Sequence, residues 1–586
     1  MCGIFGYFGR KRSDLGNLIL DGLRKLEYRG YDSWGLLVKN KESGFFLRKN
    51  IGKISDAKVV YLDSSAGIGH TRWATHGGVS KKNSHPHLDC RGKIAVVHNG
   101  IVENFQELKK YLKKLGHKFH SDTDSEVIAH LLEEEIERKL PLQAMKSVFS
   151  KIKGLNAIIA YLIDKDCFLL AKNSSPVIIG RKDRDFFIAS DVLALSGLCD
   201  EVFYMGDDQI AEIGKKGLKV VSSKGEEIQP KFKPIRISEF DISLAGFNSF
   251  MEKEINQQPE VILNILEKKF DSLQRLAEMI KSAYGSYFIG CGTAYYAALA
   301  GTYLFSKIAG HHINAAFGSE FAYLLDFIKK DSLVIALSQS GETIDVINPV
   351  KQVRKKGSKV AAITNVYGSS LYRNSDFQIL LDAGVERCVL ATKSFTAKIA
   401  VLYLAAHIMA GSFDKGRANL LKAVSELKKI IMNADRIRRL AGTFAKHKHI
   451  FILGRGISYP LALESALKIK EASYIHAEGF AAGELKHGVI ALIEKGIPVI
   501  VYNPADETYR DTLSSAFEIK SRGAYVIGIS SLENDVYDEF IKVEDCGDAG
   551  VIPSVAAAQL IGLYLAERKG YDPDKPRNLA KSVTVK

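Results

Sequence analysis

The chain has 586 residues, which is too long for one ordinary hydrophobic core, so two to four domains are expected. Hydrophobic residues make up 46% of the chain and charged residues 25%, without a surplus of Gly or Pro, which excludes disordered and fibrous classes. The net charge is +14, but Lys and Arg fall in short clusters without interleaved aromatic residues. We therefore expect solvated helix faces and no nucleic-acid partner.

The cysteines and the apolar segments bear on cellular location. Seven Cys without C-x-x-C spacing argue against a disulfide framework or a zinc knuckle and favour a reducing compartment. The longest uncharged run, residues 282–306, is broken by Gly285, Gly290 and Gly292, so it suits a strand, loop and helix better than a membrane span. No basic segment followed by an apolar one opens the chain, so no secretion signal is expected. These features predict a cytoplasmic protein with no membrane partner.

The first 230 residues alternate short strands and turns with a few helices, which is an α+β pattern. Residues 93–99 form a β-rich run, and residues 124–136 have helical periodicity after a Thr-Asp cap. Residues 225–248 carry two Pro and little periodicity. We predict a first domain over residues 2–230, a linker over 231–248 and a second unit that begins near Phe250.

The second half of the chain repeats itself. Residues 288–295 and 452–459 share the pattern G-x-G-x-x-Y, with Gly290 and Gly454 about 164 residues apart. Each copy is followed by a Glu-bearing turn and then by two apolar strands, at residues 333–337 and 360–365 in the first copy and 498–502 and 524–530 in the second. This alternation is typical of a parallel sheet covered on both faces. We predict two doubly wound lobes, over residues 249–430 and 431–575, and a tail over residues 576–586.

A Ser-rich loop in the first lobe is a candidate phosphate site. It follows a strand and opens a helix, whose free N–H groups and dipole favour an anion. The hydroxyl and amide side chains of this loop are Ser338, Gln339, Ser340 and Thr343. The second copy has Pro504 and Asp506 there, so only the first lobe should bind phosphate, with Thr293 and Thr392 as candidate further ligands. Dinucleotide binding is not expected, because Tyr295 replaces the third Gly of that motif.

Cys2 is a candidate nucleophile. Removal of Met1 would give one residue both a thiol and a free α-amine, whose reference pKa of about 7.7 to 8.0 lets it act as a general base. The alternative is that a Cys lies near the terminus by chance. That interpretation is favoured only if no related motif accompanies Cys2 in the sequence.

Five motifs accompany Cys2 in order: residues 1–4, 27–33, 69–77, 98–100 and 123–126. With them the sequence resembles the N-terminal-nucleophile glutaminases of class II glutamine amidotransferases. The resemblance implies that Arg72 binds the glutamine carboxylate, that Asp124 binds its amino group, and that Asn99 and Gly100 form the oxyanion hole. It also implies a pocket lined by Trp73, Thr75 and His76.

Four histidines in this region could suggest a metal: His70, His76, His85 and His87. They lack Cys or carboxylate companions at ligand spacing, so we expect core or loop histidines, no metal and no cofactor.

A second candidate site lies in the second lobe. Glu464, Lys468 and Glu471 share one helical stripe amid apolar residues, so we expect them to face a cleft; the alternative is a surface ion pair worth about 0.3 to 0.5 kcal/mol. His487 is titratable near neutrality, and the tail lacks periodicity, as expected for a segment that covers a site.

These features make the second half similar to the paired sugar isomerase domains of the glutamine:fructose-6-phosphate amidotransferase family. The resemblance implies that ammonia from glutamine passes through an internal channel gated by Trp73 and aminates fructose 6-phosphate, which then isomerises to glucosamine 6-phosphate. It implies that Lys581 forms a Schiff base, His487 assists ring opening, Glu471 moves a proton between C1 and C2, and Lys468 steadies the enolate. It places Cys291, Gly292, Thr293 and Ala580 at the sugar phosphate. His487 comes from the neighbouring subunit in relatives, which implies a homodimer.

Two departures and two alternatives accompany this resemblance. Ala294 stands where Ser is usual, and residues 388–393 form an unusual loop, so sugar preference stays open. An amidotransferase or deglycase acting on another phosphorylated ketose is one alternative. A sugar-phosphate-sensing regulator is another, but it predicts a DNA-binding helix and leaves Cys2 and Arg72 without a role.

Overall fold

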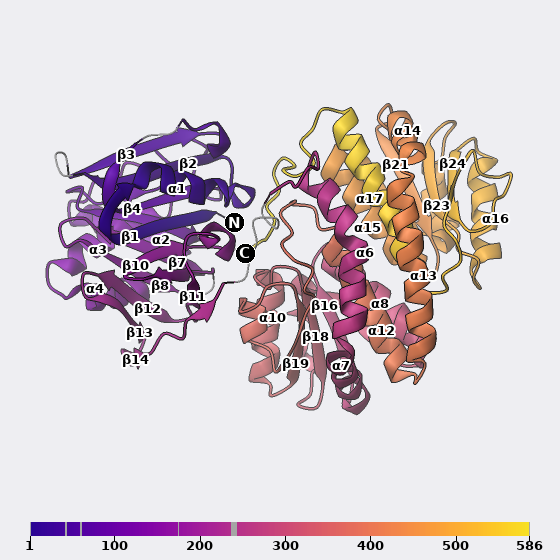
Figure 1. Cartoon of the computed structure of the whole chain (residues 1–586), viewed down its shortest axis with the longest axis horizontal. Coiled ribbons are helices and arrows are strands. Elements are labelled where there is room, and N and C mark those ends of the chain that lie inside the picture. The colour runs from indigo at the N-terminus through magenta and orange to yellow at the C-terminus, as the bar shows by residue number, and fades with distance from the viewer. Residues whose placement is uncertain (1, 41–43, 59–60, 174, 236–242, 585–586) are drawn as a thin grey trace. The chain divides into compact units, whose positions relative to one another are not determined.

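The computed structural model describes residues 2–40, 44–58, 61–173, 175–235 and 243–584. The chain divides into two compact units, one formed by Met1–Ser243 with Ala580–Lys586 and one by Leu244–Leu579 (Figure 1). Met1, residues 236–242 of the predicted linker and residues 585–586 of the predicted tail lie outside the described residues.

The N-terminal unit contains two antiparallel sheets. In spatial order, the first sheet comprises β15 (Lys233–Pro234), β11 (Glu201–Tyr204), β9 (Ile178–Lys182), β10 (Asp185–Ala189), β1 (Gly3–Asp14), β4 (Asp63–Arg72), β2 (Ser33–Asn40) and β3 (Gly44–Ile51). The second comprises β14 (Glu227–Ile228), β13 (Gly217–Ser222), β12 (Gln209–Gly214), β8 (Cys167–Lys172), β7 (Asn156–Leu162), β6 (Ile94–Gly100) and β5 (His87–Leu88). The helices are α1 (Leu15–Arg24), α2 (Phe105–Lys114), α3 (Glu126–Ile136) and α4 (Pro141–Lys151), with short 3-10 turns η1 (Glu27–Arg29), η2 (Ile54–Asp56) and η3 (Val192–Leu195).

The two sheets stack face to face, and helices cover their outer faces (Figure 1). Ile4 and Ile68 of the first sheet share one core with Val97 and Ile159 of the second. Helix α1 packs on the outer face of the first sheet, while α3 and α4 pack on the second. The predicted α+β class is therefore confirmed, and the layers form a helix–sheet–sheet–helix sandwich.

The predicted strand over residues 93–99 is β6, but the predicted helix over residues 124–136 begins later, at Glu126. Asp124 does not cap this helix, because its Oδ2 accepts a hydrogen bond from the Val102 N–H at 2.7 Å. The Asp124 carboxylate is thus held toward the end of β6.

The C-terminal unit contains two parallel sheets of the same topology. In spatial order, the first comprises β17 (Asn314–Phe317), β16 (Ser286–Gly290), β18 (Leu333–Ser338), β19 (Lys359–Thr364) and β20 (Phe377–Leu380). The second comprises β22 (His476–Ala481), β21 (His449–Gly454), β23 (Pro498–Tyr502), β24 (Tyr525–Ser530) and β25 (Glu539–Lys542). The helices are α6 (Phe250–Lys268), α7 (Phe270–Ser282), α8 (Thr293–Ala309), α9 (Gly318–Phe321), α10 (Ile344–Lys355), α11 (Ser370–Arg373), α12 (Lys393–Met409), α13 (Phe413–Met432), α14 (Asp435–Phe444), α15 (Ser458–Ser473), α16 (Tyr509–Lys520) and α17 (Val551–Arg568), with 3-10 turns η4 (Leu325–Phe327), η5 (Ala482–His487) and η6 (Val489–Leu492).

The repeat predicted from the sequence is confirmed by this shared topology. Gly290 and Gly454 end the equivalent strands β16 and β21, and each precedes a helix that passes close by. A Cβ on Gly290 would lie 2.7 Å from the Ala294 backbone, and one on Gly454 would lie 2.1 Å from the Ser458 carbonyl oxygen. Both positions therefore require glycine. The two Glu-bearing turns predicted at residues 319–321 and 477–479 are wrong, since the first lies in the short helix α9 and the second within β22.

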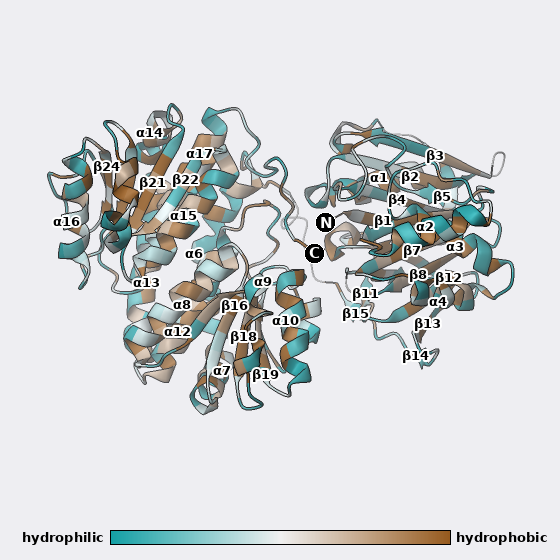
Figure 2. Cartoon of the chain, turned by 180° about the vertical axis from the view of Figure 1, so that it is seen from behind, coloured by the Kyte–Doolittle hydropathy of each residue, from teal (hydrophilic) through white to brown (hydrophobic). Residues whose placement is uncertain are grey.

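The two lobes share one hydrophobic core, to which both sheets and helices α12 and α17 contribute. Hydrophobic residues concentrate on the strands, whereas α10 and α16 carry polar surfaces (Figure 2). Among the described residues, one helical segment, Gly547–Arg568, is long and apolar enough to cross a membrane, but 89% of its apolar 18-residue window is buried inside the unit. The core helix of a globular unit is buried to a similar degree.

Candidate active sites

Cys2 lies where strand ends from the two sheets of the N-terminal unit meet. The Trp73 N–H, just after β4, donates to the Cys2 Sγ at 3.2 Å. The Asn99 Nδ2, near the end of β6, donates to the Cys2 carbonyl at 2.9 Å. Burial raises the pKa of the Cys2 thiol, so a base must remove its proton before it attacks.

The predicted oxyanion pair is held in a fixed orientation. The His70 Nε2 lies 3.1 Å from the Asn99 Oδ1, which turns the amide nitrogen of Asn99 toward Cys2. Burial lowers the pKa of His70 to about 3, so its ring is neutral and can donate this bond. Gly100 has φ of +144°, and a Cβ there would lie 2.0 Å from the Leu155 carbonyl oxygen, so this position requires glycine.

Arg72 and Asp124 bring opposite charges close to Cys2. The Arg72 guanidinium donates to the carbonyls of His76, Gly77 and Gly78 at 2.6, 2.9 and 3.2 Å. Burial lowers the pKa of Arg72, while the nearby charges of Cys2 and Asp124 oppose that shift.

The lining residues Trp73 and His76 are half-buried in the same segment, and Thr75 is exposed. The structure therefore brings Cys2, Arg72, Asp124 and Asn99 into one region of the N-terminal unit.

The motif at residues 27–33 supports this segment, a role that the sequence did not reveal. A Cβ on Gly30 would lie 2.8 Å from the backbone of Arg72 and Trp73. Asp32 accepts a hydrogen bond from the Ala74 N–H at 2.8 Å. Arg29 forms a buried ion pair with Asp191, which anchors the motif to the first sheet.

Helix α15 carries a buried charge cluster in the C-terminal unit. The Lys468 Nζ lies 2.5 Å from Glu471 Oε2 and 3.6 Å from Glu464 Oε1. Burial alone would lower the pKa of Lys468, but the two carboxylates outweigh burial and raise it. Burial raises the pKa of Glu464 to about 7. The alternative of a surface ion pair is therefore wrong, since Glu464 and Lys468 are fully buried.

Thr293 joins this cluster from the other lobe. Gly292 has φ of +52° and ends the turn after β16, so that α8 begins at Thr293. The Thr293 hydroxyl donates to Glu464 Oε1 at 3.2 Å. Burial raises the pKa of the neighbouring Cys291 to about 11, which keeps this thiol protonated.

The Ser-rich loop lies between β18 and α10, as predicted. The Gly341 N–H donates to the Ser338 Oγ at 3.1 Å, and the Thr343 Oγ1 lies 3.1 Å from the same oxygen. Gln339 and Ser340 are half-buried in the loop. Thr392, the other candidate ligand, is fully buried, and its Oγ1 has no hydrogen-bond partner among the described residues.

The equivalent loop of the second lobe borders a cavity of about 190 Å³ with a different charge. Asp506, Glu544, Asp545 and Asp548 line this cavity together with Lys307. Lys307 already pairs with Asp548 at 2.8 Å. This acidic lining disfavours a phosphate, in agreement with the asymmetry expected between the two lobes.

The remaining predicted residues lie outside this cluster. His487 is exposed at the end of η5. Leu579 packs against the core of the C-terminal unit, whereas Ala580 and Lys581 group with the N-terminal unit. Val583, in the same tail, is 42% exposed. The placement of Lys581 over the isomerase site stays a prediction.

Comparison with known proteins identifies the class. Residues 70–197 match the family model described as a glutamine amidotransferase domain, and residues 279–408 and 443–543 match the SIS domain. The chain is therefore a glutamine amidotransferase with paired SIS lobes. It is 40% identical to the glutamine–fructose-6-phosphate aminotransferase [isomerizing] of Thermococcus kodakarensis and 37% identical to that of Clostridium tetani, with full coverage of both chains in each case. The chain belongs to the glutamine–fructose-6-phosphate aminotransferase family.

A solved structure agrees with this assignment. The C-terminal domain of glucosamine-fructose-6-phosphate aminotransferase from Francisella tularensis matches with a TM-score of 0.52 and 32% identity. The match covers 57% of this chain and 99% of that domain.

Proposed function

We propose that the protein aminates fructose 6-phosphate with nitrogen from glutamine and isomerises the product to glucosamine 6-phosphate, releasing glutamate. The observation that carries this proposal is the presence, in one chain, of an oriented Cys2–Asn99 pair and of a buried acid–base cluster on an SIS lobe. The full-length similarity to aminotransferases of this name supports the same reaction.

The N-terminal unit would release ammonia. The α-amine exposed by removal of Met1 takes the Cys2 thiol proton, and the thiolate attacks the glutamine amide carbon. An Asn amide has two N–H bonds, so the bond to the Cys2 carbonyl leaves one for the oxyanion, next to the Gly100 N–H. The protonated α-amine then gives its proton to the leaving nitrogen, so ammonia departs and a thioester remains. Water hydrolyses the thioester, which restores the Cys2 thiol and releases glutamate. Arg72 and Asp124 hold the two charged ends of glutamine throughout.

The C-terminal unit would use this ammonia, which passes internally to the sugar. The loop with Ser338 and Thr343 holds the phosphate at the start of α10. His487 assists ring opening, and the Lys581 amine condenses with the C2 carbonyl of the open sugar, with loss of water, to form a Schiff base. Ammonia then displaces the lysine amine and leaves an imine at C2. Glu471 then transfers a proton between C1 and C2 while Lys468, 2.5 Å away, balances the charge of the enolate-like intermediate.

We also propose a cytoplasmic homodimer. The exposed position of His487 on its own unit supports its delivery to the site of a second copy. Mixing a His487→Ala chain with a Glu471→Gln chain should then restore activity that neither variant has alone.

The test of the proposed reaction is incubation with glutamine and fructose 6-phosphate, followed by identification of the aminosugar. Cys2→Ala should abolish glutamine hydrolysis, while free ammonia still supports weak synthesis, and mass analysis should find Met1 absent. Removing the hydroxyls of Ser338 and Thr343 should raise the KM for the ketose and leave the KM for glutamine near its normal value. Formation of a different aminosugar, or none, would favour an enzyme that uses another phosphorylated ketose.

A further inference from the structure

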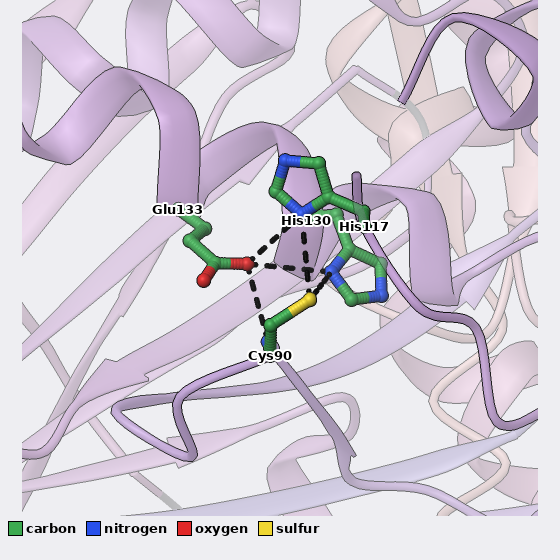
Figure 3. A group of neighbouring side chains, drawn as sticks. All are labelled: Cys90, His117, His130 and Glu133. Carbon is green, nitrogen blue, oxygen red and sulfur yellow. Dashed lines mark hydrogen bonds and ion pairs between the residues drawn. The ribbon is translucent and has the colours of Figure 1, made fainter. Parts of the chain in front are cut away.

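Four side chains of metal-ligand type converge in the N-terminal unit, away from Cys2 and its partners (Figure 3). Cys90 lies in the turn after β5, and His117 follows the end of α2. His130 and Glu133 lie one helical turn apart on α3, so they share a face. One potential ligand atom from each residue lies within 4.8 Å of the other three.

The distances between these atoms match a tetrahedral metal site. The Cys90 Sγ lies 3.5 Å from the Nδ1 of His117 and 3.5 Å from the Nδ1 of His130. The Glu133 Oε2 lies 3.1 Å from His117 Nδ1 and 3.4 Å from His130 Nδ1. Zn²⁺ with bonds of about 2.0 to 2.3 Å at tetrahedral angles holds its ligand atoms roughly 3.3 to 3.6 Å apart. These four separations are close to those expected around one ion, and the other two separations within the group are no more than 4.8 Å.

The outer contacts orient these side chains. The far nitrogen of His117, Nε2, lies 2.9 Å from the Glu134 carboxylate. The far nitrogen of His130 lies 3.7 Å from the Glu126 carboxylate. A hydrogen bond such as that between His117 and Glu134 fixes the ring of a metal-binding histidine and increases its basicity. The His130 Nε2 is buried without a hydrogen-bond partner among the described residues, although the Glu126 carboxylate faces it. The side chains of His117, His130 and Glu133 are no more than 8% exposed, while Cys90 is exposed and offers a path of entry.

We propose that Cys90, His117, His130 and Glu133 bind one structural Zn²⁺. Thiolate and imidazole ligands favour zinc over Mg²⁺ and Ca²⁺, which prefer oxygen ligands. Four protein ligands close a tetrahedral site and leave no position for a substrate, so the role is structural. On binding, the Cys90 thiol releases its proton to solvent and becomes the thiolate ligand.

The site would brace the segment that carries Asp124. Glu126, which faces His130, also accepts the N–H groups of His120 and Ser121, both at 2.7 Å. A metal that joins His117 to His130 would link the two ends of the segment between α2 and α3, and so brace the start of α3 and the loop before it. Because Asp124 lies in this loop, loss of the metal is expected to raise the KM for glutamine more than it lowers kcat.

The test is the metal content of the purified full chain, measured by mass spectrometry. We expect about one zinc per chain in the wild type, much less in Cys90→Ser and His130→Ala, and the wild-type content in the matched control His120→Gln, an exposed neighbour. Because the variants could fold poorly, wild-type protein stripped with a chelator provides a second measurement. Adding Co²⁺ should give one tetrahedral cobalt spectrum with a thiolate charge-transfer band, and adding zinc should abolish it.

Several results would overturn the proposal. These are no saturable zinc or cobalt binding by the stripped wild type, a cobalt spectrum without the thiolate band, or unchanged zinc in a folded Cys90→Ser protein. Metal content is measured independently of aminosugar formation, so failure of this proposal and failure of the proposed reaction are distinguishable.

Discussion

Replacing Glu464 by Gln should change how the stability of the protein depends on pH. Burial raises the pKa of Glu464 to about 7 from its ordinary 4.5, which at about 1.4 kcal/mol per pKa unit amounts to roughly 3 kcal/mol. Below pH 4.5 the carboxyl is protonated in both the folded and the unfolded chain. Between pH 4.5 and 7 the folded chain holds the extra proton, so the free energy of unfolding falls as the pH rises. Above pH 7 the loss is complete.

Gln cannot ionise, so the free energy of unfolding of the variant should not fall over this pH range. Lys468 keeps its contact with Glu471 at 2.5 Å in the variant. Urea unfolding at a series of pH values from 4.5 to 8 should show the variant gaining up to about 3 kcal/mol relative to the wild type. Glu533→Gln, an exposed replacement, controls for the removal of a surface carboxylate. Parallel stability curves for Glu464→Gln and the wild type across this range would refute the argument that burial governs Glu464.

Two further changes test other parts of the structure. Gly454→Ala places a Cβ 2.1 Å from the Ser458 carbonyl oxygen and should lower the stability by about 3 kcal/mol and raise the KM for the ketose, because α15 must shift. The control is Gly442→Ala in α14, where a Cβ has nothing within 4 Å, and its free energy of unfolding should rise by about 0.5 to 1 kcal/mol. Equal melting temperatures for the two variants would contradict the steric clash at Gly454. Lys581→Arg should eliminate aminosugar formation while glutamine hydrolysis persists, and borohydride should trap a sugar adduct in the wild type alone. Wild-type synthesis by Lys581→Arg would disprove the Schiff-base role.

The local pattern of apolar residues and glycines in the sequence was enough to predict the repeated α/β architecture. The apolar run at residues 498–502 became β23 residue for residue, because a buried parallel strand needs a continuous apolar sequence. The pairing of Glu464 with Lys468 likewise follows from helical spacing. Their full burial does not, because it depends on Thr293 and α8, which precede α15 by more than a hundred residues.

Other features had no local signal. The start of α3 was misplaced by two residues because Asp124 binds the Val102 N–H, a contact that only the folded chain creates. The four proposed zinc ligands lie between residues 90 and 133 without a familiar spacing. The histidines that lie close together in the sequence, such as His70 and His85, are not among these ligands. These two rings stack at 4.2 Å in the core behind Asn99.

The bond between Thr293 and Glu464 has a consequence for how the duplicated half evolved. Two copies of one lobe would ordinarily offer two equivalent sites, yet in the proposed mechanism the first copy holds the phosphate and the second supplies the proton-transfer group, Glu471. Under that mechanism a single reaction needs residues from both copies. An inactivating change in one lobe would then not be compensated by the other lobe. Selection would preserve the contact between the lobes as strictly as the residues within each lobe.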